Sequence, residues 1–323
     1  MKAIQISTHG GPEVLEWVEL PVPQPDPGQL LLRQTAIGLN YIDTYHRTGL
    51  YPVPMPFIPG MEAVGVVEAL GEGVTGFAVG DRVAYAWPPI GAYAEYRVFP
   101  AAMAVKVPEG IADDIAAGIM LKGCTVEYLV RRTFAVQPGQ TVLWHAAAGG
   151  VGLLAVQWLK AIGATVIGTV GSQAKAELAR AAGCDHIILY REQDVAARVR
   201  EITAGKGVPV VYDSVGKDTF VASLDSLSPR GLLVSFGNAS GPVTGVDLGI
   251  LATKGSVYVT RPTIVHYYAT PEDRAAGAGA LFDMVRSGRI TPRVDQRYAL
   301  KDAAHAHHDL EARATTGSTV LIP

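Results

Sequence analysis

The sequence predicts an α/β protein with two domains, one rich in β-strands and one built on a doubly wound parallel sheet. Two observations carry this expectation. Up to about residue 121, short apolar runs alternate with glycine and proline turns, a pattern typical of compact β domains. From about residue 123, apolar strands alternate with segments of helical spacing. That alternation indicates a parallel sheet with right-handed crossover connections.

The β-rich part, which we expect over residues 1–122, contains apolar runs that we interpret as strands. They lie at residues 29–33, 63–69, 81–85 and 94–99. Segments rich in turn-forming residues separate them, at residues 21–28, 51–60 and 71–76. Short strands punctuated in this way predict a barrel or a sandwich.

The second domain is expected over residues 123–262 and begins with a helix at residues 124–132. Strands are predicted at residues 141–145, 165–170, 186–190, 208–213 and 231–236, with helices at 152–162, 173–182, 195–203 and 220–227 between them. Residues 263–323 are too few for a domain of their own. They contain two predicted helices, at 271–287 and 301–314, and a strand at 318–322, and we expect them to return to the first domain.

Composition excludes several classes of function. The 323 residues carry a formal net charge of −3, so nucleic acid and anionic membrane surfaces are poor candidate partners. Two cysteines, Cys124 and Cys184, cannot build a disulfide framework. The first ten residues have no apolar signal region, and no apolar run reaches the ~18 residues of a membrane span. We therefore expect a cytoplasmic protein.

The strongest functional signal is the segment Ala146-Ala147-Ala148-Gly149-Gly150-Val151-Gly152, directly after a predicted strand and before a predicted helix. Gly149 lets the backbone approach a pyrophosphate, and Gly152 lets the helix pack closely on the strand. The N–H groups at the helix start would then face the phosphates. Ala147 replaces the first glycine of the usual fingerprint, and a loop that binds nothing is the alternative. The strand–loop–helix context favours a dinucleotide site formed by Ala148, Gly149, Gly150, Val151 and Gly152.

The end of the second predicted strand bears on the choice of coenzyme. An NAD site typically places a carboxylate there to bind the ribose 2′-hydroxyl. Here the strand runs into Gly171 and Ser172 without a carboxylate, and Lys175 follows in the first helical turn. A cation without a competing anion favours a 2′-phosphate and therefore NADPH. Tyr190 and Arg191 would flank the same site; the alternative is that Lys175 is a solvated surface lysine.

Several motifs together resemble a known family. They are Asn40-Tyr41-Ile42-Asp43-Thr44-Tyr45, Pro59-Gly60-Met61-Glu62, Gly80-Asp81-Arg82-Val83, the glycine-rich loop, and the segments 210–216 (VVYDSVG) and 234–238 (VSFGN). Over the whole chain, this set resembles the medium-chain dehydrogenase/reductase superfamily, and within it the quinone oxidoreductase branch. The resemblance implies a GroES-like catalytic domain plus a Rossmann domain, with the coenzyme in the cleft between them.

The departures from the alcohol dehydrogenase branch concern zinc. That branch binds a catalytic zinc through a cysteine and the histidine of a Gly-His-Glu segment, but here Asn40 and Met61 stand at those positions. Two cysteines cannot supply a structural four-cysteine zinc site either. The densest histidine group, His305, His307 and His308, is expected to be solvated helix surface. We expect no metal.

The resemblance also implies residue roles. Asn40, Tyr45 and Tyr51 would line the nicotinamide end of the site and serve as catalytic candidates, with Tyr128 as a further candidate donor. The residues that resemble coenzyme contacts are Tyr41, Tyr128, Gly171, Ser172, Lys175, Tyr190, Ser214, Phe236, Gly237, Asn238 and Arg313. Asp43 could orient a neighbour but is not expected to be the catalytic acid.

Without zinc, a carbonyl can be polarised only by hydrogen bonds, which suits a readily reduced quinone. We therefore expect hydride transfer from NADPH to quinones. Reduction of activated C=C bonds in enones or enoyl thioesters is the alternative. A non-enzymatic NADPH-binding or RNA-binding role is a third, disfavoured by the lack of basic excess. The stretch at residues 255–260 has β-branched and aromatic character and would form an exposed sheet edge. By resemblance, we expect it to join two subunits into a homodimer.

Overall fold

The computed structural model describes all 323 residues, which divide into two compact units. Unit 1 is assembled from three stretches of chain, residues 1–124, 268–286 and 292–323. Unit 2 comprises residues 125–267 and 287–291. None of the helices combines the length and apolar character that crossing a membrane requires.

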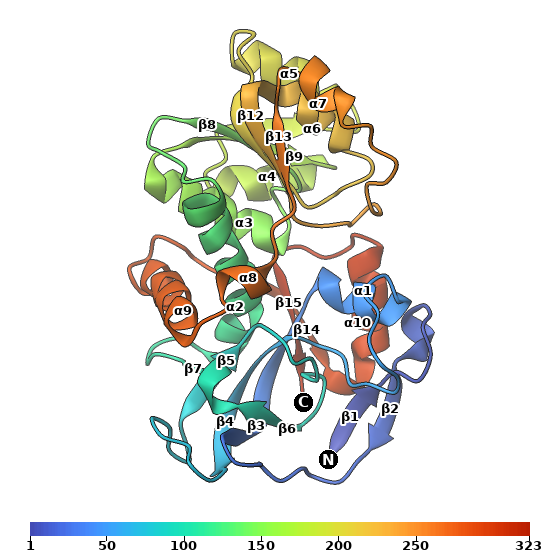
Figure 1. Ribbon diagram of the computed structural model, residues 1–323, viewed down its shortest axis with the longest axis vertical. Coiled ribbons are helices and arrows are strands. Elements are labelled where there is room, and N and C mark those ends of the chain that lie inside the picture. The colour runs from blue at the N-terminus through green and yellow to red at the C-terminus, as the bar shows by residue number, and fades with distance from the viewer. The chain divides into compact units, whose positions relative to one another are not determined.

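Unit 1 is built on a seven-stranded sheet, drawn in Figure 1, with the order β14-β15-β3-β4-β5-β7 and β6 paired to β3. Most neighbours are antiparallel, but β14 and β15 are parallel. A separate pair, β1 and β2, is antiparallel. The strands are β1 (Lys2–Gln5), β2 (Glu16–Glu19), β3 (Gln29–Leu39), β4 (Glu62–Leu70), β5 (Arg82–Tyr85), β6 (Tyr96–Pro100), β7 (Val105–Lys106), β14 (Val294–Ala299) and β15 (Ser318–Ile322).

Unit 1 also contains helices. They are α1 (Tyr41–Thr48), α9 (Pro271–Arg286), α10 (Ala303–Glu311), and short 3-10 turns at Pro12–Val14, Ala101–Met103 and Leu300–Asp302. Helix α2 (Asp113–Tyr128) contains the boundary between the two units and runs into a π-helical turn, Leu129–Thr133. Strand β3 leads directly through Asn40 into α1, so the central strand of the sheet fixes where α1 begins.

Unit 2 is a six-stranded, wholly parallel sheet with the order β10-β9-β8-β11-β12-β13. Its strands are β8 (Thr141–Trp144), β9 (Thr165–Val170), β10 (His186–Leu189), β11 (Val208–Asp213), β12 (Leu227–Ser235) and β13 (Tyr258–Thr260). Numbered along the chain, this is the order 3-2-1-4-5-6 of a doubly wound dinucleotide-binding sheet. The order reverses between β8 and β11, and ligands bind such sheets at that point.

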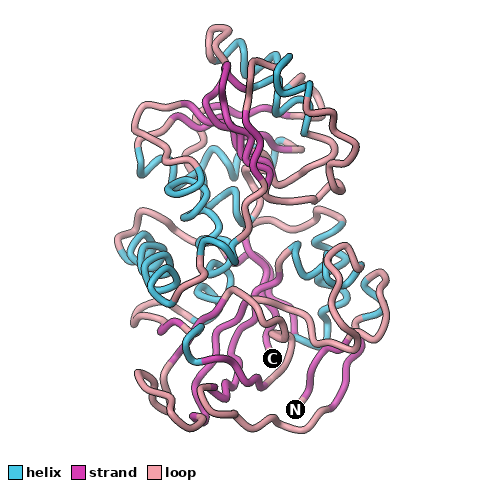
Figure 2. Tube along the Cα trace, viewed as in Figure 1, coloured by secondary structure: helices cyan, strands magenta, loops and turns pink.

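Helices surround this sheet, as Figure 2 shows for the strands and helices of unit 2. They are α3 (Gly150–Ile162), α4 (Gln173–Ala181), α5 (Val195–Ile202), α6 (Phe220–Ser226) and α7 (Gly249–Thr253). A further short helix, α8 (Ile264–Tyr267), follows β13. A buried cluster that includes Leu143, Ile167, Ile188, Val211 and Leu233 joins the strands to the helices. Burial of these side chains stabilises the sheet that carries the glycine-rich loop.

The predicted fold class, a doubly wound parallel sheet plus a GroES-like β-rich domain, is confirmed. Several boundaries were wrong. The helix expected at residues 124–132 begins at Asp113, and the strand expected at 29–33 continues to Leu39. Helix α2 is buried on nearly every side, so its sequence shows no amphipathic period that would reveal where it starts.

Candidate functional site

The glycine-rich loop leaves the carboxyl end of β8 and turns into α3. Ala146 adopts a left-handed backbone with φ of 54°, and its carbonyl accepts the N–H of Gly149 at 3.0 Å. Gly149 is the N-cap of α3 and has no side chain that could accept from the helix amides. The first turn of α3 therefore presents N–H groups that suit an anionic ligand.

Two glycines give the loop its shape. A Cβ on Gly152 would lie 2.3 Å from the carbonyl oxygen of Ala146 and 2.7 Å from that of Ala147, so only glycine fits there. A Cβ on Gly149 would meet only the Ala146 oxygen, at 3.3 Å, and would otherwise fill open space. The loop is thus a tight turn with an open approach at Gly149, as a pyrophosphate requires.

Four of the expected residues come together at the ends of β9 and β10. Ser172 is the N-cap of α4 and accepts the backbone N–H of Lys175 at 3.4 Å. The Tyr190 hydroxyl lies where it would be 2.7 Å from a Cβ on Gly171. No Asp or Glu occurs between Thr169 and Lys175. The arrangement fits a 2′-phosphate better than a 2′-hydroxyl.

A second group of expected residues lies at the ends of β11 and β12. The segment that follows β12 runs alongside Ser214: Phe236 N–H donates to Asp213 O at 2.8 Å and Ala239 N–H to Ser214 O at 3.2 Å. A Cβ on Gly237 would lie 2.3 Å from the Ser214 carbonyl oxygen. Glycine is therefore required where these two loops, which also carry Asn238, approach each other.

The remaining coenzyme candidates lie elsewhere. Tyr128 is buried at the end of α2 and stacks on Tyr267, with ring centroids 4.5 Å apart. Tyr41 and Arg313 belong to unit 1 rather than unit 2. The Tyr41 hydroxyl donates to the carbonyl of Leu310 at 3.0 Å, and Arg313 is exposed just after α10, with φ of 58°.

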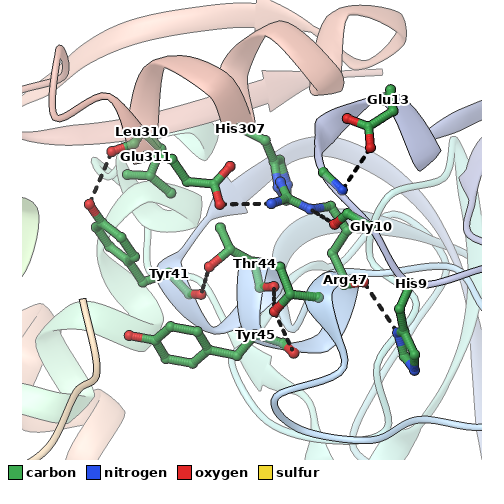
Figure 3. A network of polar contacts seen from close by, with 12 residues as sticks. His9, Gly10, Glu13, Tyr41, Thr44, Tyr45, Arg47, His307, Leu310 and Glu311 are labelled. Atoms are coloured by element: carbon green, nitrogen blue, oxygen red, sulfur yellow. Dashed lines mark hydrogen bonds and ion pairs between the residues drawn. The ribbon is translucent and has the colours of Figure 1, made fainter. Parts of the chain in front are cut away.

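In unit 1, the catalytic candidates cluster on α1 and the turn after it. Asn40 is the N-cap of α1, and the rings of Tyr41 and Tyr45 lie on one side of that helix (Figure 3). The Tyr45 and Tyr51 rings meet edge to face, with centroids 5.3 Å apart. Tyr45 and Tyr51 are half-buried, whereas Asn40 is buried. Tyr45 and Tyr51 are therefore in contact with each other, whereas the Asn40 amide is directed at Glu62.

A buried ion pair lies behind Asn40. Its side-chain amide donates to Glu62 Oε2 at 2.7 Å, and Lys122 Nζ is 3.5 Å from the same oxygen. Glu62 Oε1 accepts the backbone N–H of Leu121 at 2.6 Å. Burial raises the pKa of Glu62, while the charge of Lys122 opposes that rise. One amide hydrogen of Asn40 is therefore already committed to the protein.

The expectation for His307 was wrong. Its side chain is fully buried rather than solvated, whereas His305 and His308 are exposed. Arg47 Nη1 lies 3.0 Å from His307 Nδ1, and the hydroxyl of Tyr93 lies 3.0 Å from Nε2. Burial lowers the pKa of His307 to about 3, so the ring is neutral. Arginine is always a donor, and therefore the single ring proton sits on Nε2.

This contact ties α10 to α1. Arg47 also donates to Glu311 Oε1 at 2.7 Å and to Gly10 O at 3.1 Å, as Figure 3 shows. The Tyr93 hydroxyl donates to Asp43 Oδ2 at 3.0 Å, and the same oxygen accepts the backbone N–H of Asn40 at 2.9 Å. Burial raises the pKa of Asp43 to about 7. Sequence patterns missed Arg47 and Tyr93 because polar residues on a buried face leave no apolar period.

Side chains that could bind a metal are dispersed. No group of three or more His, Cys, Asp or Glu side chains is placed to hold a metal ion. Met61 is buried, with 2% of its surface exposed, and Asn40 makes the contacts described above.

Comparison with known proteins places each unit in a described family. Residues 26–109 match the alcohol dehydrogenase GroES-like domain, and residues 150–272 match the family described as zinc-binding dehydrogenase. Over the whole chain, 56% of residues are identical to those of a quinone oxidoreductase from Pseudomonas aeruginosa, of which 99% is covered. A 2-haloacrylate reductase from a Burkholderia species is 48% identical, over 99% of this chain and 98% of its own length.

Solved structures give the same result. The Escherichia coli quinone oxidoreductase complexed with NADPH is 50% identical and superposes with a TM-score of 0.99, covering 100% of both chains. Identity of this extent over complete chains reflects common descent as well as a common fold.

Proposed function

This chain belongs to the quinone oxidoreductase family of medium-chain dehydrogenases/reductases, and we propose from that premise that it transfers a hydride from NADPH to quinones. The observation that carries the proposal is the set of loops at the carboxyl ends of β8 to β12. Their open glycine turn suits a pyrophosphate, and the end of β9 offers a cation without a carboxylate.

The residues of unit 2 would bind and orient the coenzyme. The first turn of α3, from Gly150 to Gly152, would hold the pyrophosphate, while Ser172 and Lys175 would hold the 2′-phosphate. Bound NADPH supplies the hydride. Ser214 and Asn238, on the two loops that Gly237 brings together, would position the rest of the dinucleotide.

The residues of unit 1 would bind the substrate. Asn40 and Met61 stand where zinc-dependent relatives carry ligands, and neither side chain is an anion or an imidazole. The tyrosine pair, Tyr45 and Tyr51, offers hydroxyl groups for a quinone oxygen. A quinone suits such weak polarisation because its reduction yields a stable aromatic product.

Reduction of an activated C=C bond is the second candidate function. The observation that favours it is the 48% identity to a 2-haloacrylate reductase across nearly the whole chain. Enones, enoyl thioesters and haloacrylates share an electron-poor double bond that accepts hydride without a metal. A non-enzymatic NADPH-binding or RNA-binding role is a third candidate, and the net charge of −3 disfavours RNA.

A steady-state screen of NADPH oxidation separates these candidates. It compares benzoquinones and naphthoquinones with enones, an enoyl thioester and 2-chloroacrylate, each with and without a metal chelator. We expect quinones to give the highest kcat/KM and the chelator to change nothing. A higher kcat/KM for haloacrylate or enone would move the assignment to C=C reduction, and the absence of any turnover would contradict an enzymatic role.

The tyrosine pair should contribute modestly to the rate. We expect Tyr45→Phe and Tyr51→Phe each to lower kcat/KM for quinones by roughly tenfold or less, because one neutral hydrogen bond contributes about 0.5–1.5 kcal/mol. Steady-state kinetics with matched melting curves provide the measurement. A loss above about a thousandfold in a folded variant would mean that the hydroxyl is an obligatory proton donor.

A homodimer forms part of the proposal. Strand β13 pairs only with β12, and Tyr258 and Val259 on this edge are 60% and 40% exposed. Pairing two such edges would satisfy their backbone groups and make one continuous sheet. Light scattering should give twice the mass of the chain, and Val259→Lys should shift it towards the monomer. Val22→Lys, at a 42% exposed site in unit 1, is the control. A monomeric wild type at micromolar concentration would contradict this arrangement.

The quinone or enone would be a small molecule, and we place the enzyme in the cytoplasm with no membrane or nucleic-acid partner.

A further inference from the structure

A chain of buried polar side chains runs through unit 2 from the end of β8 to the end of β11. His145 follows β8, Thr169 lies on β9, Asp213 ends β11 and Ser223 lies on α6. None of the four side chains is more than 1% exposed. Buried polar groups must satisfy one another, so the hydrogens in this chain can be assigned one by one.

The assignment begins at Asp213, whose carboxylate can only accept. Its Oδ1 accepts the backbone N–H groups of Val215 at 2.8 Å and Gly216 at 3.1 Å. Its Oδ2 accepts the hydroxyls of Thr219 at 2.7 Å and Ser223 at 2.8 Å. The single hydroxyl hydrogen of Ser223 is therefore committed to Asp213. His145 Nε2, which lies 3.0 Å from Ser223 Oγ, must consequently be the donor in that contact.

The hydrogen bonds on the other side of His145 can be assigned because its imidazole is neutral. Burial lowers the pKa of His145, although the charge of Asp213 opposes this effect. With its hydrogen on Nε2, the ring accepts at Nδ1, and the Thr169 hydroxyl donates to it at 3.0 Å. Thr169 Oγ1 in turn accepts the backbone N–H of Ala146 at 3.3 Å. Each hydrogen bond in this series of side chains then has a defined donor and a defined acceptor.

The two ends of this chain hold the two loops that flank the reversal point of the sheet. At one end, Ala146 keeps a left-handed backbone that costs a residue with a side chain about 1 kcal/mol. Its carbonyl closes the turn onto Gly149 and lies against Gly152. At the other end, Asp213 fixes the amides of Val215 and Gly216. The strands that carry these loops, β8 and β11, are neighbours.

We propose that His145 is a positioning residue for the coenzyme: through Thr169 it holds the glycine-rich loop, and through Ser223 it locks that loop to the loop after β11. This inference rests on the proposed function, because it takes NADPH to bind at these two loops. His145 has no contact with the ligand in this role. It sets the geometry of the amides that would meet the pyrophosphate and is therefore required equally for NADPH and NADH.

Two serines on α6 make a matched test. Ser223 and Ser226 are both fully buried. The Ser226 hydroxyl, however, donates to Ala222 O at 2.7 Å and is not part of the series of hydrogen bonds through His145. Ser223→Ala should raise the dissociation constants of NADPH and NADH by the same factor, about three- to tenfold, with kcat nearly unchanged. Ser226→Ala should leave both constants unchanged. Thr169→Val, which removes both contacts of that hydroxyl at little change in volume, should weaken both coenzymes more than Ser223→Ala does.

The tautomer gives a second readout that needs no coenzyme. Nitrogen-15 NMR of the wild-type protein should show two histidine rings, those of His145 and His307, that stay neutral with the hydrogen on Nε2 between pH 5 and 8. Only the signals of His145 should move in Ser223→Ala. A proton on Nδ1 of His145 would overturn the positioning role of this residue. Equal losses of coenzyme affinity in Ser223→Ala and Ser226→Ala would also overturn it. Failure of the wild type to bind either coenzyme would overturn the proposed function and this role together.

Discussion

Lys122→Met is expected to destabilise unit 1 strongly. Glu62 is fully buried and Lys122 nearly so, and they form an ion pair at 3.5 Å behind Asn40. Removing the lysine leaves a buried carboxylate without its counter-charge, which typically costs 3–5 kcal/mol. We expect the melting temperature to fall by roughly 10 °C. Calorimetry or a circular dichroism melt provides the measurement.

Two further variants test that explanation. Lys2→Met removes a closer pair, Lys2 to Glu19 at 2.8 Å, but both partners are exposed and the melting temperature should barely change. The double variant Glu62→Gln/Lys122→Met carries neither charge of this pair and should recover much of the lost melting temperature. A loss in Lys2→Met as large as that in Lys122→Met would show that burial does not decide the effect.

The same pair predicts a dependence on pH. Burial already raises the pKa of Glu62 above its ordinary 4.5, and losing Lys122 raises it further. A carboxyl with a raised folded pKa contributes stability that is present below the ordinary value and lost as the pH rises through the folded value. The stability gap between wild type and Lys122→Met should therefore be small near pH 4 and widen towards neutral pH.

Lys175→Ala should weaken NADPH by roughly 10- to 150-fold and leave NADH nearly unchanged. A charge-assisted hydrogen bond from the ammonium group to the 2′-phosphate contributes about 1.5–3 kcal/mol. The N-terminus of α4 still attracts the phosphate, so the lower end of the range is expected. Dissociation constants for both coenzymes, at fixed ionic strength, provide the measurement. Equal losses for NADPH and NADH would mean that Lys175 does not contact the phosphate.

Adding a carboxylate at the end of β9 should also move the coenzyme preference away from NADPH. Gly171→Asp should repel the 2′-phosphate and shift preference towards NADH. A Cβ at this position would lie 2.7 Å from the Tyr190 hydroxyl, so any side chain displaces that partly exposed group. Gly171→Asn has nearly the same size without the charge and is the matched control. If Asp and Asn shifted preference equally, displacement of Tyr190 rather than charge would be the cause.

The parallel sheet could be predicted closely from sequence. Strands β9 (Thr165–Val170) and β11 (Val208–Asp213) begin and end at the predicted residues. Both are short apolar runs rich in β-branched residues, with turn formers at each end, and the structure buries them on both faces. The glycine-rich loop was equally visible, because a tight strand-to-helix turn restricts the residue at Gly152.

Unit 1 was harder to predict because its interior near the site is polar. The buried residues of α1 include Asp43, Thr44, His46 and Arg47, so no apolar stripe marks this helix. His307 lies beside two exposed histidines, and only the approach of Arg47 and Tyr93 from distant segments distinguishes it. Such partners meet through the fold, and local spacing carries no trace of them.

The discontinuity of unit 1 has a consequence for how the protein is made. Its central strand β3 ends at Leu39, but its neighbour β15 begins only at Ser318, and the pair brings Leu39 opposite Thr319. A ribosome must therefore synthesise all of the intervening chain before this sheet can close. Unit 2 takes nearly all of its residues from one continuous stretch and can fold first. Until synthesis reaches β15, the end of β3 at residues 37–39 lacks the strand that pairs with it and can recruit a neighbouring chain.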